Sequence, residues 1–85
     1  MTTEQRIEAI DALLTEQLAP SFLKIEDNSA EHAGHQSAGG AGHYTIHIAA
    51  DLFEGKSLIQ KHRLVYGAVD SLMETEIHAL SIKLR

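Results

Sequence analysis

The stretch that decides the fold is residues 43–84, HYTIHIAADLFEGKSLIQKHRLVYGAVDSLMETEIHALSIKL. Both of its ends alternate apolar and polar residues with the period of two that is typical of β-strands, whereas its middle repeats apolar residues at helical spacing. We therefore predict strands at 43–48 and 77–84, joined through a helix that begins after Ser57. A helical crossover of this length usually connects parallel strands. The last strand is thus predicted to lie parallel to another strand.

Each predicted element has one apolar face that can join a common core. The core-facing residues are expected to be Tyr44, Ile46 and Ile48 in the first of these strands, Leu80, Ile82 and Leu84 in the second, and Leu58, His62, Val65, Val69 and Leu72 in the helix, with Ile59, Tyr66 and Met73 widening the helical stripe. Phe53 and Gly55 form a predicted turn before the helix, for which Ser57 is a plausible N-cap.

The N-terminal part adds a helix and a strand. Thr2 and Gln5 have the spacing of a capping box. The apolar residues that follow share one stripe of a helix that ends before Pro20: Ile7, Ile10, Leu14 and Leu18. Residues 22–27 alternate Leu23 and Ile25 against polar neighbours, which predicts a half-buried strand. This strand is expected to form a hairpin with the strand at 43–48.

The elements follow the order helix, strand, strand, helix, strand. We expect an α+β fold, a two-layer sandwich of helices on a three-stranded mixed sheet, in a single domain over residues 1–85. A chain of 85 residues buries only about 60% of the surface that its unfolded form exposes, so a deep internal active site is not expected.

The segment between the first two strands has a different composition. From Asn28 to Gly42 it consists mainly of Ser, Ala, Gly and His. Ordering such a segment would bury little apolar surface against a large loss of conformational entropy. We predict a long, mobile loop, which carries His32 and His35.

Composition excludes several classes of function. The chain has no cysteine, so it can form no disulfide, thiolate nucleophile or self-sufficient iron–sulfur site. Its formal net charge of −5 weighs against strong unassisted binding to nucleic acid. No apolar run approaches the roughly 20 residues of a membrane span and no signal-peptide pattern opens the chain, which favours a cytoplasmic location.

Catalytic motifs do not emerge from the sequence. Gly55, Lys56 and Ser57 resemble the end of a phosphate-binding P-loop, but Phe53 and Glu54 precede them and the motif's earlier glycine is missing. We find no nucleophile elbow and no metalloprotease motif. The protein is expected not to be an enzyme.

Of the six histidines, three are interpreted without a metal role and three are candidate metal ligands. His43 and His47 lie four residues apart on a predicted strand, about 13 Å from each other, so they cannot chelate one ion together and are interpreted as structural or solvent-facing. His62 is expected to be hydrogen-bonded at the edge of the core. His32 and His35 in the loop, with His78 at the start of the last strand, are candidate imidazole ligands for a metal whose coordination a partner completes.

Three blocks of sequence resemble the BolA family. They are the turn Phe53, Gly55 and Ser57, the basic run Lys61, His62 and Arg63, and the closing run Ile77 to Ile82, which match the family's F-x-G-x-S, R/K-H-R and V/I-H-A-L-S patterns. Together with residues 20–27 and the start of the strand at His43, the resemblance covers nearly the whole chain.

The resemblance implies a fold similar to a type II KH domain and a partner, a monothiol glutaredoxin. It implies a [2Fe–2S] cluster shared with the glutaredoxin and its glutathione, which would supply the thiolates, and no cluster on the chain alone. By position, His78 corresponds to one ligand and His32 to the other, with His35 as the less favoured loop ligand. On its own the chain is expected to be a monomer or weak homodimer.

Two other functions stay open. The first is a DNA-binding transcriptional regulator that uses the KH-like surface, with Lys56, Lys61 and Arg63 on the phosphates. The second is a small interaction module whose histidines have no metal role.

Overall fold

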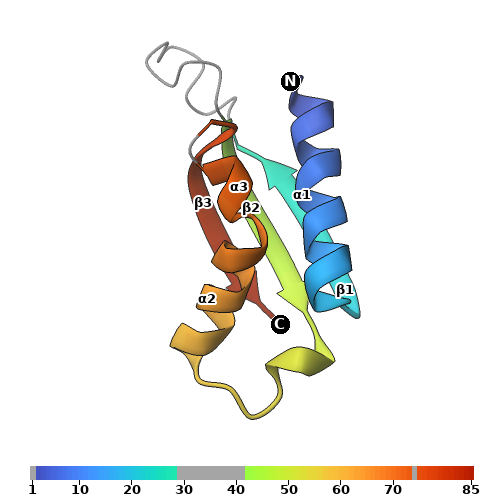
Figure 1. Ribbon diagram of the computed structural model, residues 1–85, viewed down its shortest axis with the longest axis vertical. Helices are drawn as coiled ribbons and strands as arrows, with labels where there is room; N and C mark the ends of the chain where they lie inside the picture. Colours follow the sequence, from blue (N-terminus) through green and yellow to red (C-terminus); the bar gives the residue numbers. More distant parts are fainter. Residues whose placement is uncertain (1, 29–41, 74) are drawn as a thin grey trace.

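The computed structural model describes residues 2–28, 42–73 and 75–85. Its elements are α1 (Thr3–Leu18), β1 (Phe22–Asp27), β2 (Gly42–Ala49), the 3-10 helix η3 (Asp51–Phe53), α2 (Leu58–Ala68), α3 (Asp70–Met73) and β3 (Ile77–Leu84). The helices lie on one face of a single sheet (Figure 1). The predicted α+β architecture and the predicted order of the main elements are confirmed. The predicted loop from Asn28 to Gly42 lies, apart from these two end residues, outside the described residues.

The sheet has the order β1-β2-β3. β2 pairs antiparallel with β1, with Ile25 opposite Ile46, and parallel with β3, with Ile46 opposite Ile82. The mixed sheet is therefore a hairpin to which the crossover through α2 and α3 adds a parallel third strand. Because β2 is central, its core-facing residues are covered most completely: Tyr44, Ile46 and Ile48 are all buried.

Helix α1 begins and ends as its sequence predicts. Thr2 and Gln5 form a capping box, in which the Gln5 amide donates to Thr2 Oγ1 and the Thr2 amide donates to Gln5 Oε1. Ile10, Leu14 and Leu18 are buried on the predicted stripe. The helix ends at Ala19, whose φ of 46° is left-handed, and Pro20 follows with no amide hydrogen to continue the helix.

Helix α2 differs from its prediction in its first turn. Ser57 caps it as predicted and Val65 is buried, but Leu58 and Ile59 are each 65% exposed and Tyr66 is 39% exposed. The first turn lies at the lower edge of the molecule, away from α1 (Figure 1). Among the described elements, none buries Leu58 or Ile59, so the first turn of α2 does not contribute to the core as its spacing predicted.

The predicted long helix is also interrupted. Val69 has φ −106° and ψ 11°, outside helical geometry, and separates α2 from α3. Gly67 and the β-branched Val69 are both poor helix formers. Val69 and Leu72 are nevertheless both buried. These two residues of the predicted stripe therefore belong to the core although the helix is interrupted at Val69.

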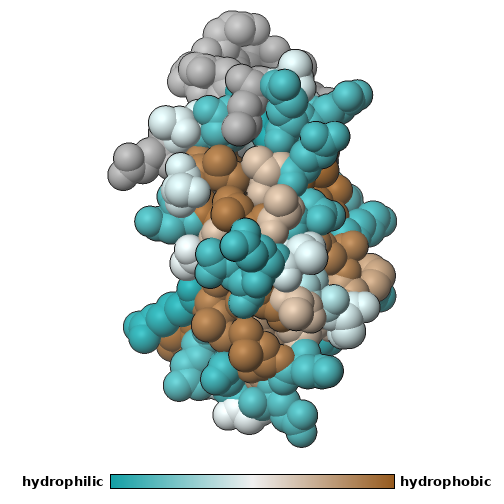
Figure 2. Space-filling view, turned by 45° about the vertical axis from the view of Figure 1, so that its right-hand side comes forward, coloured by the Kyte–Doolittle hydropathy of each residue, from teal (hydrophilic) through white to brown (hydrophobic). Residues whose placement is uncertain are grey.

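One hydrophobic core holds the layers together. Its buried members are Ile10, Leu14, Leu18, Tyr44, Ile46, Ile48, Phe53, Val65, Ala68, Val69, Leu72 and Ile77. On the outside, apolar surface occurs in patches separated by polar side chains (Figure 2). None of the helices in the described parts of the chain has the length and apolar character needed to cross a lipid bilayer.

Candidate functional site

A β-bulge at the start of β3 determines where His78 lies. Gly42 pairs with Ile77, but the next residue of β2, His43, pairs with Ala79, so His78 is the extra residue of the bulge. Ile77 is 1% exposed, whereas His78 and Ala79 are both exposed. After the bulge, Leu80 and Ile82 return to the helix side. The extra residue thus lets Ile77 and Leu80 share the core face while His78 points out of it.

The bulge brings two histidines together. The rings of His43 and His78 have their centroids 4.9 Å apart and are tilted by 51°. His43 is half-buried and lies on β2 on the sheet face that the helices leave uncovered. The two residues are 35 positions apart in sequence but start neighbouring parallel strands. They were treated separately in the sequence analysis, because the last strand was predicted to lie parallel to another strand without saying which one; a histidine at the start of each of two predicted strands was the available signal.

The other predicted metal ligands lie elsewhere. His32 and His35 are outside the described residues. Within the described ranges, no group of three or more His, Asp or Glu side chains is arranged to hold a metal ion. A metal at His78 would therefore need ligands beyond the two adjacent imidazoles.

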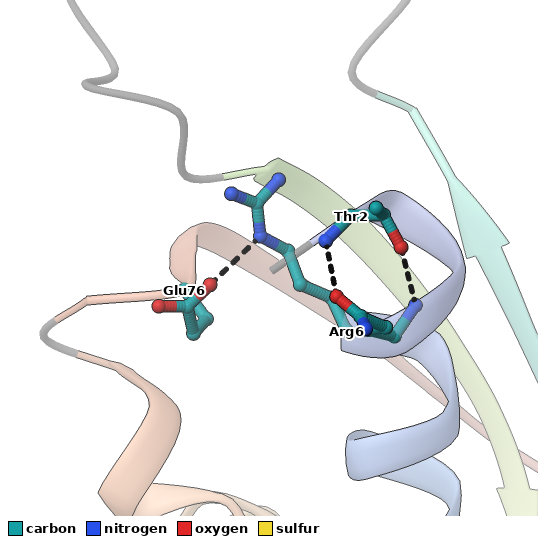
Figure 3. Close-up of polar contacts among 4 residues, drawn as sticks. Thr2, Arg6 and Glu76 are labelled. Atoms are coloured by element: carbon teal, nitrogen blue, oxygen red, sulfur yellow. Dashed lines mark hydrogen bonds and ion pairs between the residues drawn. The ribbon is translucent and has the colours of Figure 1, made fainter.

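An ion pair ties α1 to the residue two positions before His78. Arg6 Nε donates to Glu76 Oε1 at 3.0 Å, and both side chains are largely shielded from solvent, at 13% and 20% exposed (Figure 3). The hydrogen bond from Arg6 holds the pKa of Glu76 below its ordinary value. The Gly42 amide donates to the Glu76 carbonyl at 3.1 Å. Glu76 therefore anchors the start of β3 both to α1 and to β2.

Tyr44 packs beneath this anchor. Its side chain is 2% exposed and its hydroxyl makes no hydrogen bond of acceptable geometry with the described residues. Burial raises the pKa of Tyr44, and the nearby Arg6 guanidinium opposes that rise. A Cβ on Gly42 would lie 2.5 Å from Tyr44 Oη and 2.6 Å from Cζ. Gly42 is thus needed because the tyrosine ring lies directly against its Cα.

The sheet face away from the helices is polar. Next to His43, a hollow of about 330 Å³ is lined by Asn28, His43, Tyr44, Thr45, Ala79, Ser81 and Lys83. Thr45 Oγ1 donates to Asn28 Oδ1 at 2.5 Å. Further along β2, His47 Nε2 lies 2.5 Å from Glu26 Oε1, which agrees with its interpretation as a structural histidine.

The start of α2 forms a second region. Lys56 and Arg63 line a hollow of about 280 Å³ together with Gln60 and Leu64, whereas Lys61 is not part of its lining. His62 lies with the exposed Leu58 and Ile59 along a neighbouring hollow. It makes no hydrogen bond to any described residue, so the prediction that it is hydrogen-bonded at the core edge is wrong. The hollow beside His62 is lined only by residues of α2, none of which forms a hydrogen bond with its ring.

Comparison with known proteins supports the resemblance. A family model described as "BolA-like protein" matches residues 14–85. The chain is 43% identical over 75 residues to "SufE-like protein 1, chloroplastic/mitochondrial" of Arabidopsis thaliana, covering 81% of this chain and 20% of that protein. It is 39% identical over 83 residues to "Protein BOLA1, chloroplastic" of the same plant, covering 93% of this chain and 52% of that protein. It therefore spans about half or less of these relatives.

A more distant relative and a solved structure complete the comparison. "DNA-binding transcriptional regulator BolA" of Escherichia coli (strain K12) is 29% identical over 75 residues, covering 88% of this chain and 70% of that protein. The solved "BolA domain of SufE1 from Arabidopsis thaliana" superimposes with a TM-score of 0.80 at 34% identity, covering 100% of this chain and 94% of that chain. The match in fold therefore extends over all the elements described above.

Proposed function

The chain belongs to the BolA-like family, and from this premise we propose that it is a non-enzymatic adaptor for a monothiol glutaredoxin. In the proposed complex it lends imidazole ligands to a [2Fe–2S] cluster that the glutaredoxin and its glutathione also hold. The role of such a complex is iron sensing or delivery of the cluster. His78 is the ligand on the folded scaffold, and His32 is the proposed loop ligand, with His35 as its alternative.

The position of His78 is the observation that carries this proposal. The residue is exposed at a bulge, yet its neighbours are firmly held, because Ile77 is buried in the core and Glu76 is anchored to Arg6 and Gly42. A ligand whose backbone is fixed loses little conformational freedom when a partner's cluster binds. The arrangement favours His78 as a preorganised ligand that faces an incoming protein.

The chemistry of the available donors fits a shared cluster. Imidazole nitrogen is a suitable ligand for iron, and histidines replace two cysteines on one iron of Rieske-type [2Fe–2S] centres. The remaining ligands of such a centre are thiolates, which this cysteine-free chain cannot provide. The proposal therefore requires a partner that contributes sulfur, as a glutaredoxin with bound glutathione does.

Mixing experiments test this function. Adding the purified chain to a cluster-loaded monothiol glutaredoxin should shift the visible absorption and circular dichroism bands, because nitrogen replaces part of the sulfur ligation. His78→Ala should abolish the shift. His47→Ala is a matched control, because His47 faces the same side of the sheet but bonds to Glu26, and it should retain the shift. Unchanged spectra, or a shift that survives His78→Ala, would contradict the proposal.

A second candidate is binding to DNA through the start of α2. The supporting observation is that Lys56 and Arg63 share one hollow beside the capped end of the helix, and one relative carries the name of a DNA-binding regulator. The formal net charge of −5 opposes it. Phosphate contacts make binding fall steeply with salt, so retention in gel shifts should drop between low and moderate salt and with Lys56→Ala. Absence of retention at micromolar protein would rule it out.

A further inference from the structure

We propose that His43 and His78 together form a binding site for a divalent transition-metal ion on this chain alone, without a glutaredoxin. The site goes beyond the proposed adaptor function, because it uses a histidine that has no part in the proposed cluster ligation and needs no second protein. It shares His78 with that function, so the metal ion and the partner's cluster compete for the same imidazole.

The geometry of neighbouring strands makes the pair possible. Adjacent strands lie about 4.8 Å apart, and the two rings are 4.9 Å apart between centroids. Two histidines four residues apart on one strand, such as His43 and His47, are separated by about 13 Å and cannot share an ion. The bulge adds the decisive step, because it turns His78 out of the core at the residue next to the pairing partner of His43.

The local structure limits how far the pair can separate. The Gly42 amide bonds to the Glu76 carbonyl, and the Asn28 amide donates to the His43 carbonyl at 2.7 Å. The backbone on both sides of the site is therefore held by hydrogen bonds, and in the proposed site one nitrogen of each ring points at a common ion. Zinc–imidazole bonds of about 2.0–2.1 Å require such convergence.

The chemistry of the donors selects the class of ion. Two neutral imidazoles suit Zn²⁺, Cu²⁺, Ni²⁺ and Co²⁺, whereas Mg²⁺ and Ca²⁺ prefer oxygen ligands. Since the described residues offer no group of three ligands, water completes the coordination. Such a two-ligand site binds Cu²⁺ more tightly than Zn²⁺, following the usual order of metal affinities.

The experiment titrates the wild-type chain with Zn²⁺ while the histidine ring resonances are followed by NMR, with calorimetry for affinity and light scattering for molar mass. One Zn²⁺ should bind per monomer, and the His43 and His78 resonances should shift together. His43→Gln and His78→Gln should each weaken binding at least tenfold. Mg²⁺ at the same concentrations should leave the resonances unchanged.

Matched variants separate this site from other histidines. His47→Gln and His62→Gln should leave the affinity within twofold, as should the double variant His32→Gln with His35→Gln. Loss of binding in the loop double variant, unmoved His43 resonances in the wild type, or binding seen only with a doubled molar mass would each overturn the proposal. If a variant fails to fold, the shifts of the His43 and His78 resonances in the wild-type chain still show whether these two residues bind Zn²⁺.

The experiments distinguish a wrong metal-site proposal from a wrong adaptor proposal. If His43 takes no part in binding Zn²⁺ but His78→Ala still abolishes the spectral shift with glutaredoxin, only the metal site on the isolated chain is wrong. If Zn²⁺ binds as described and glutaredoxin spectra stay unchanged, only the adaptor function is wrong.

Discussion

At the start of β2, the strand that pairs with β3 beside His78, Gly42 and Tyr44 pack directly against each other. The tyrosine ring occupies the space in which any other residue at position 42 would place its Cβ. Above it, Arg6 reaches from α1 to Glu76. The site is therefore supported by residues that carry none of its chemistry, and substitutions there report on that support.

Gly42→Ala should destabilise the fold by about 1–3 kcal/mol, the usual cost of overpacking a close-packed site. The added methyl group meets a tyrosine ring that is only 2% exposed. Chemical denaturation measures the effect. Gly67→Ala is the matched control, because its Cβ would meet nothing within 4 Å and alanine in the last turn of α2 should stabilise the helix by up to about 0.5–1 kcal/mol. Equal effects at the two positions would contradict this account.

The ion pair at Glu76 should make stability depend on pH in the acid range. Arg6 lowers the pKa of Glu76 in the folded state, so the ionised carboxylate stabilises the fold above the ordinary glutamate pKa of about 4.3. This contribution is lost as the pH falls through the lowered pKa. The stability difference between wild type and Glu76→Gln should be constant near neutral pH and should shrink in acid. A difference that grows on acidification would have the wrong sign.

At the level of elements, the spacing of apolar residues predicted whether a segment forms a helix or a strand. Which of its residues are buried depends on tertiary contacts. The capping box and the stripe of α1 are local properties of the sequence and are confirmed. The stripe of α2 was wrong at Leu58 and Ile59, because helical spacing says which residues share a face but not whether another element covers it. The break at Val69 likewise depends on packing.

The bulge in β3 shows the same limit at the candidate site. The period of two correctly predicted that Leu80, Ile82 and Leu84 face the core. By the same alternation Ile77 should face away from the core, but it is buried. The pairing with β2 shows that β3 has one extra residue, His78, which allows Ile77 and Leu80 both to face the core. The same bulge brings His78 against His43. His78 was predicted from the sequence as a candidate ligand, whereas its contact with His43 was not predicted, because it depends on the register of β2 and β3.

The end of α1 offers a prediction for an element boundary. Ala19 has a left-handed φ of 46°, a conformation that is unfavourable for residues with a Cβ. Ala19→Gly should therefore stabilise the protein by about 0.5–1 kcal/mol, the strain relieved less the extra entropy of glycine in the unfolded chain. Thermal and chemical denaturation both measure this change. A loss of stability would show that the alanine methyl group contributes more through packing than its backbone costs.

At the scale of the whole molecule, the two faces of the sheet differ in what they contact. The helices occupy one face of the sheet (Figure 1), and on the other face a hollow lined mostly by polar residues reaches His43, whose ring lies against that of His78. A chain of 85 residues without cysteine provides a rigid scaffold with nitrogen ligands and, in the function proposed, depends on a partner for sulfur. In that function, histidine nitrogen of this chain bonds directly to iron in the complex.

Pulsed electron paramagnetic resonance on the reduced complex tests it most directly. The chain would be labelled with ¹⁵N-histidine and mixed with an unlabelled, cluster-loaded monothiol glutaredoxin. We expect ¹⁵N couplings strong enough for direct bonding of two imidazoles to iron; His78→Ala should remove at least one of them, and His47→Ala should leave both. A spectrum with no directly bonded ¹⁵N in the wild-type complex would contradict this expectation.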